Sequence, residues 1–150
     1  MTDINDVLKR LPKDWFARPP MSGSVSTILS KNLMQAFQDD FIAYHMQSDG
    51  GEGRLGKIYV TLWPLSDSER LTKEYRFHEY MHPDLLAIGT ADDAFIALDF
   101  SGGDIQWVVF PFGDFDLDEI CTINDTFTGL LVSFIDNQFP EKARRLLLPK

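Results

Sequence analysis

The sequence predicts a single α+β domain in which helices flank a twisted, largely antiparallel sheet. Two observations predict it. The chain has 150 residues, of which 44% are hydrophobic and 13% aromatic, a composition typical of one globular domain with its own core. Closely spaced strand-like segments occupy its middle, and segments with helical periodicity precede and follow them. No repeat or linker interrupts residues 1–150, so we expect one domain.

The N-terminal third is predicted to be helical, with one irregular arm. Residues 6–11 suit a short helix closed by Pro12, and the proline-rich stretch 12–24 predicts an arm anchored by Trp15 and Phe16. From 24 to 46, apolar residues recur at helical spacing. The glycines that follow residue 48 are expected to end this helix.

Strands are predicted at residues 57–65, 85–90, 94–100 and 105–112, where β-branched and aromatic residues concentrate. A helix is expected from Phe127 to Ile135, with Asn124 or Asp125 as its N-cap. Pro140 predicts the start of a final helix with a basic last turn.

Charge and cysteine content narrow the function classes. The formal net charge is −9, and residues 77–141 contain thirteen Asp and Glu residues but no Lys or Arg. Nucleic acids and anionic membranes attract basic surfaces, so neither is an expected partner. An acidic surface suits a basic protein partner, or simply solubility. Cys121 is the single cysteine, and the start lacks a signal-peptide pattern, so we expect a cytoplasmic protein without membrane spans.

Residues 49–57, DGGEGRLGK, match both GxGxxG and GxxxxGK. Such loops hold phosphate because a strand enters them and a helix leaves them. Here a helix is expected before the glycines and a strand after them, and Ile58 replaces the magnesium-binding Ser or Thr. We therefore interpret the glycines as turn residues, with no nucleotide and no other cofactor expected.

Two further motifs suggest metals. His78, Glu79 and His82 match HExxH, in which two histidines one helical turn apart bind zinc, but Pro83 disfavours a continuous helix. Asp114, Asp116 and Asp118 alternate as in a calcium loop, where Glu119 replaces the required glycine. We expect no metal at either motif.

The segment GGEGRLGKIYVTLWPL resembles the glycine-rich turn and first strand of the SUKH superfamily. The similarity continues through EYMHPDLLAIGT, AFIALDF and VVFPF, and covers about residues 33–135. At 90–94 the chain has TADDA, where the family usually has a glycine-rich turn. The family includes bacterial immunity proteins and a fungal regulator of cell-wall synthesis.

The resemblance implies a SUKH-like fold with a mixed sheet, and a non-enzymatic protein that binds other proteins. Many members neutralise polymorphic toxins, often nucleases, so the implied partner is a toxin domain with a basic surface. Five residues match the family's recurrent motif: Glu52, Gly53, Gly56, Trp63 and Pro64.

Taken as residues, the motif is structural. Gly53 and Gly56 are expected at positive φ, Trp63 in the core, and Glu52 as a cap for turn amides. The predicted partner-binding surface is acidic and comprises six residues: Asp92, Asp93, Asp114, Asp116, Asp118 and Glu119. Two alternatives remain open, namely a zinc-dependent hydrolase built on His78, Glu79 and His82, and a housekeeping interaction module.

Overall fold

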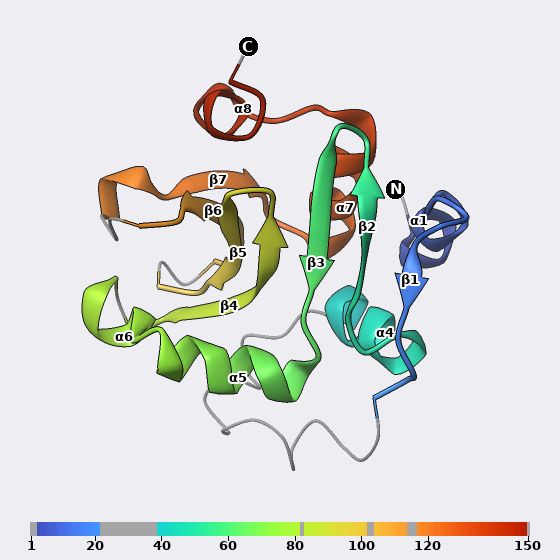
Figure 1. Cartoon of the computed structure of the whole chain (residues 1–150), viewed down its shortest axis with the longest axis horizontal. Helices are drawn as coiled ribbons and strands as arrows, with labels where there is room; N and C mark the ends of the chain where they lie inside the picture. Colours follow the sequence, from blue (N-terminus) through green and yellow to red (C-terminus); the bar gives the residue numbers. More distant parts are fainter. Residues whose placement is uncertain (1–2, 22–38, 82, 102–103, 114–116, 150) are drawn as a thin grey trace.

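A computed structural model of the chain describes residues 3–21, 39–81, 83–101, 104–113 and 117–149. Its centre is a seven-stranded sheet whose strands lie in sequence order, β1 to β7, each antiparallel to its neighbours (Figure 1). Helices lie against both faces of the sheet. The predicted α+β class and the largely antiparallel sheet are therefore confirmed.

The strands alternate buried and exposed side chains where only one face is covered. Their bounds are β1 Phe16–Ala17, β2 Gly51–Leu55, β3 Ile58–Leu62, β4 Leu85–Ala91, β5 Ala94–Asp99, β6 Gln106–Pro111 and β7 Cys121–Asn124. The helices are α1 Ile4–Lys9, α4 Asp39–Gln47, α5 Leu65–Glu74, α6 Phe77–Tyr80, α7 Phe127–Asp136 and α8 Glu141–Leu147, with a short 3-10 helix, η1, at Leu117–Glu119. None of the helices in the described ranges is long and apolar enough to span a membrane.

The larger hydrophobic core lies between the sheet and helices α1, α4, α7 and α8. Trp107 of β6 is fully buried at its centre. Its ring centroid lies 5.1 Å from that of Phe41 in α4 and 5.3 Å from that of Phe127 in α7. The apolar face predicted for residues 127–135 is thus the face of α7 that packs on the sheet.

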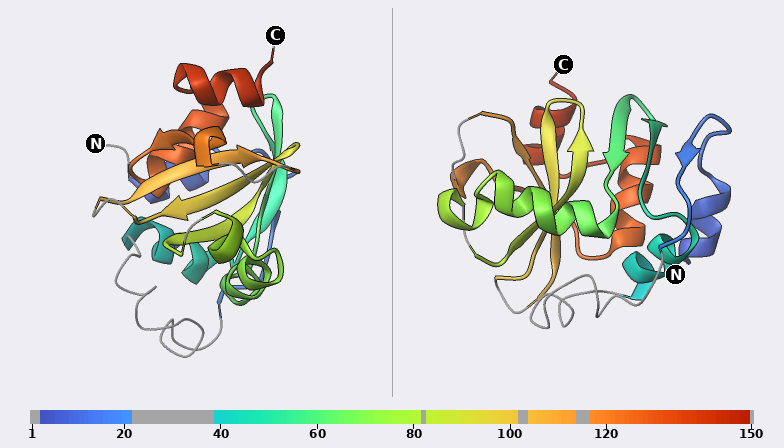
Figure 2. Two further views of the ribbon diagram at one scale, coloured as in Figure 1. Left: turned by 90° about the vertical axis from the view of Figure 1, so that its left-hand side faces the viewer. Right: turned by 60° about the horizontal axis from the view of Figure 1, so that its bottom comes forward.

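A second, smaller core lies on the other face of β4, β5 and β6, beneath α5 and α6 (Figure 2). Phe95 is at its centre, 5.0 Å from Phe77 and 5.5 Å from Phe110 between ring centroids. Since β4 to β6 are covered on both faces, they are nearly continuous apolar runs.

Several predicted boundaries need correction. The expected helix at 24–46 is described only from Asp39 onward, and the rest of it lies outside the described residues. Helix α7 is capped by Thr126, whose hydroxyl accepts a hydrogen bond from the Gly129 amide at 2.9 Å, rather than by Asn124 or Asp125. Helix α8 begins after Pro140, as predicted.

Helix α5 was not expected from the sequence, because its buried face carries Leu65, Ser68 and Thr72 rather than an apolar stripe. It lies beside the first half of β4, at the point where β3 no longer pairs with that strand. There the Thr72 hydroxyl accepts a hydrogen bond from the Ala87 amide at 3.0 Å and donates one to the Ser68 carbonyl at 2.6 Å. A side chain thus replaces the missing neighbouring strand.

Thr72→Val should lower the free energy of unfolding by about 1–3 kcal/mol, because the substitution keeps the shape but leaves the buried Ala87 amide without an acceptor. Ser68→Ala is the matched control on the same helix. Within the described ranges the buried Ser68 hydroxyl has no hydrogen-bond partner, so its removal should be neutral or slightly stabilising. Urea denaturation of both variants measures the difference, and equal losses would contradict this role of Thr72.

Candidate functional site

The glycine-rich segment forms a β-hairpin. Gly51–Leu55 is strand β2, Gly56 and Lys57 form the turn, and β3 follows. The Lys57 amide, which a phosphate loop would direct at its ligand, donates instead to the Asn137 side-chain oxygen at 2.8 Å. The segment therefore lacks the strand–loop–helix order of a nucleotide site.

Both Gly53 and Gly56 were expected to have positive φ, and only one of them does. Gly56 has φ +58°, as predicted. Gly53 is an ordinary strand residue without positive φ, so that prediction was wrong. A side chain is excluded at Gly53 because its β-carbon would lie 2.9 Å from the Trp15 ring.

The other motif residues also have structural surroundings. Trp63 is only partly buried and packs on the smaller core, 6.3 Å from Phe95 between ring centroids, so its assignment to a buried core position was wrong. Pro64 is the N-cap of α5. Glu52 does not cap turn amides: its carboxylate accepts a hydrogen bond from the Tyr59 hydroxyl on the neighbouring strand.

The HExxH motif does not form one helix. Helix α6 ends at Tyr80, Met81 has non-helical angles, and His82 lies outside the described residues. The His78 Nε2 atom lies 2.9 Å from the Leu85 carbonyl oxygen, and because that oxygen can only accept, Nε2 carries a proton and is not free to bind a metal. Over the described parts of the chain, no three His, Cys, Asp or Glu side chains are grouped to hold a metal ion.

The predicted acidic surface is divided in the fold. Asp114 and Asp116 lie outside the described residues, and Asp118 and Glu119 are exposed in η1. Asp92 and Asp93 form the β4–β5 turn. There Asp92 has φ +49°, and its carboxylate accepts a hydrogen bond from the Tyr59 amide at 3.0 Å. Asp92 therefore holds the turn against β3.

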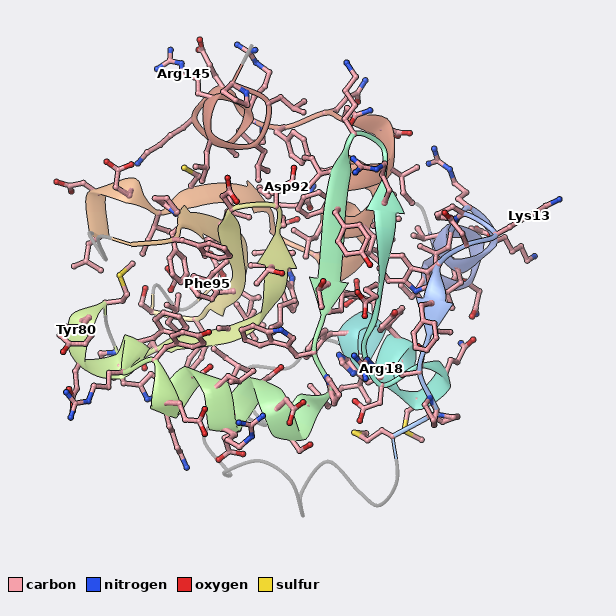
Figure 3. All side chains as sticks on the ribbon, in the orientation of Figure 1. Lys13, Arg18, Tyr80, Asp92, Phe95 and Arg145 are labelled. Atoms are coloured by element: carbon pink, nitrogen blue, oxygen red, sulfur yellow. The ribbon has the colours of Figure 1, made fainter. Side chains whose placement is uncertain are left out.

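Basic helix α8 packs beside these acidic residues. Lys142 donates hydrogen bonds to the carbonyl oxygens of Asp118 and Ile120. The other end of the helix lines a cavity of about 170 Å³ together with Asp92 and Asp93, and Figure 3 shows Asp92 beneath the helix that carries Arg145. The positive charges that residues 77–141 lack in sequence are thus supplied by the next helix.

On a different surface, which we call the open face, the described residues leave part of the sheet without a covering helix. On β2 and β3, the residues that alternate with the buried ones face away from the larger core: Glu52, Arg54, Tyr59 and Thr61. Helices α5 and α6 cover this side of the sheet only over β4 to β6. Figure 1 shows α7 behind β2 and β3, and no described helix in front of them.

A groove of about 470 Å³ lies on this open face. It is lined by Asp14, Phe16, Glu52, Gly53, Arg54 and Tyr59. Phe16 is 63% exposed and Tyr59 is 41% exposed, although both lie on strands paired with β2. The open face therefore presents two large rings from strands of the sheet.

Hydrogen bonds order the polar groups of the groove. The Tyr59 hydroxyl donates to Glu52 Oε2 at 2.6 Å, and Arg18 lies 3.9 Å from Glu52 Oε1. The hydrogen bond to Glu52, with smaller contributions from partial burial and from the charges of Glu52 and Asp14, raises the pKa of Tyr59. The hydroxyl consequently stays protonated at neutral pH and holds Glu52 in place.

Sequence reasoning identified only part of this groove. Glu52 and Gly53 were singled out, but Phe16 was expected to anchor the N-terminal arm, whereas its side chain is largely exposed. Tyr59 was detectable, because it alternates with Ile58, Val60 and Leu62 and so points away from the core. The position of Asp14 and Phe16 beside β2 depends on a two-residue strand that no local pattern predicts.

Comparison with known proteins does not identify the chain: no protein-family model matches it, and no curated protein matches it.

Proposed function

We propose that the protein is a non-enzymatic binding domain that holds a protein partner on the open face of β1, β2 and β3. The observation that carries this proposal is the pair of exposed rings, Phe16 on β1 and Tyr59 on β3, that line one groove of the sheet. Aromatic side chains concentrate in the central parts of protein interfaces, where their burial contributes much of the binding free energy.

The chemistry of the described histidines and cysteine supports binding rather than catalysis. His78 is hydrogen-bonded to the main chain of β4, and His45 is buried against Asp49 at 2.8 Å. Burial raises the pKa of the Cys121 thiol, which favours the unreactive protonated form. Each of these groups has a structural role, and none is paired with a second catalytic group in the manner of a nucleophile and its base.

The biological role we propose is immunity to a toxin. The motif similarity to the SUKH superfamily supports it, as does a net charge of −9, which favours association with a basic toxin domain. Complementary charge mainly accelerates the encounter, whereas buried rings slow dissociation. The proposal therefore assigns attraction to the overall charge and tight binding to the open face.

Co-expression with a toxin domain encoded by a neighbouring gene tests the proposal, and the absence of any such gene would contradict the immunity role. The wild-type protein should restore growth of cells that make the toxin. Phe16→Ser combined with Tyr59→Ser should abolish the rescue and weaken binding to the purified toxin at least about 100-fold, as expected for two central aromatic residues. Tyr80→Ser is the matched control, because Tyr80 is an exposed ring on α6, away from the open face.

A second double variant distinguishes the open face from the acidic surface as the site of the interface. Asp118→Asn with Glu119→Gln removes exposed charge from η1, and should reduce the association rate and its salt dependence while leaving the dissociation rate nearly unchanged. Rescue that survives the loss of both rings but fails without these acids would place the interface on the acidic surface. Failure of the wild-type protein to protect cells would contradict the immunity role.

A further inference from the structure

We infer that the groove on the open face is a binding site for a cationic, planar side chain, namely an arginine that the partner inserts between Phe16 and Tyr59. This inference rests on the proposed function, since it names the group that the partner presents. A small guanidinium compound should also bind to this site, so the inference is testable without the partner.

The carboxylates of the groove have unused capacity to accept hydrogen bonds. The Tyr59 hydroxyl donates to Glu52 Oε2. Among the described residues, Oε1 has only Arg18 near it, at 3.9 Å, which is beyond hydrogen-bond distance. The Asp14 carboxylate forms no hydrogen bond or ion pair with any residue in the described ranges. Two negative groups thus face one groove with acceptor atoms available to a cation.

The rings and the floor provide the shape for a flat group. Phe16 of β1 is directly opposite Glu52 of β2. Tyr59 of β3 is directly opposite Arg54 of β2. The main chain of Gly53, between Glu52 and Arg54 in β2, lines the floor of the groove. A guanidinium group stacks on an aromatic face while its edge donates hydrogen bonds to carboxylates, which an ammonium group cannot do in the same way.

The cations already present are held at the margins. Arg54 donates a hydrogen bond from its guanidinium to the Lys57 carbonyl at 2.9 Å, so its charge is directed toward the β2–β3 turn. Arg18 directly follows β1 and lies 3.9 Å from Glu52 Oε1, and Figure 3 shows it near α4. Arg54 therefore repels an incoming cation from one end of the groove, and this gives the test a variant with the opposite sign.

The experiment titrates N-acetylarginine methylamide into the isotope-labelled protein and follows the amide resonances of β1, β2 and β3 by NMR. These resonances should shift saturably, and the citrulline analogue, which has the same shape without charge, should produce no saturable shift. Glu52→Gln combined with Asp14→Asn should weaken binding about fivefold, and Arg54→Met should strengthen it by up to about fivefold, the range measured for exposed charge pairs. Phe16→Leu should also weaken binding.

Glu79→Gln is the matched control, because Glu79 is an exposed carboxylate on α6 outside the groove; its binding should equal that of the wild type. Melting temperatures verify that each variant is folded. The inference is overturned if arginine produces no saturable shifts in the groove, if citrulline binds equally well, or if Arg54→Met weakens binding. Because the titration contains no toxin, its failure would leave the rescue experiment intact, and a failed rescue would leave the groove's preference for arginine intact.

Discussion

Gly89→Ala is expected to lower the free energy of unfolding by about 3 kcal/mol, at the upper end of the usual cost of overpacking. Gly89 lies on β4 opposite Leu62 of β3, next to the irregularity between Ala87 and Gly89. A β-carbon at this position would overlap the main-chain carbonyl oxygen of Thr61. Main-chain atoms of a paired strand cannot rotate aside, so the two strands must separate.

Gly113→Ala provides the comparison. Gly113 has φ +95°, but an added β-carbon there would meet no atom of the described residues within 4 Å. The free energy of unfolding of this variant should fall by only about 1 kcal/mol, the cost of an unfavourable backbone conformation. Urea denaturation of both proteins measures the two losses, and a Gly89→Ala protein that is as stable as Gly113→Ala would contradict the close approach of β3 and β4.

Gly56→Ala should destabilise the fold by about 2–4 kcal/mol, because two costs combine at this residue. Its φ of +58° is unfavourable for alanine. In addition, a β-carbon would overlap the Phe134 carbonyl oxygen and the Asn137 side chain at the end of α7.

Gly56→Asn separates the two costs, since asparagine tolerates positive φ but still brings a β-carbon. We expect it to recover little of the stability lost by Gly56→Ala in thermal and urea denaturation. Lys57→Ala is the neighbouring control and should have a small effect, because the contact at Lys57 comes from its amide. Full recovery with asparagine would show that conformation alone, without contact to α7, decides this position.

The sequence predicts most of the elements whose buried faces are apolar, although β7, which buries Cys121 and Ile123, was not predicted. The strands β3 to β6 and helix α7 carry Val, Ile, Leu and Phe at the expected periods, and each was predicted close to its observed bounds. Helix α5 was missed, because its buried face includes Ser68 and Thr72. Strand β2 was predicted to be a turn, because it contains Gly51 and Gly53 and is followed by Gly56.

The candidate site was likewise predictable only in part. The outward direction of Tyr59 follows from the alternation of β3, but its hydrogen bond to Glu52 depends on the register of a hairpin that the sequence did not predict. Phe16 is an aromatic residue in a proline-rich arm, and aromatic residues are more often buried than exposed. Its exposure follows from the pairing of β1 with β2, which is a tertiary contact.

The consecutive order of the seven strands has a consequence for the speed of folding. Each strand pairs with the strands before and after it along the chain, so most pairings close short loops, and short loops lose little entropy when they form. The pairings of β1 with β2 and of β3 with β4 close longer loops. The contact of the N-terminal helix with α7 spans far more of the chain, because Arg10 lies 2.5 Å from Asp136, 126 positions away. The hairpins of the sheet are therefore expected to form first and rapidly, and the docking of α1 against α7 to be the late, slow event.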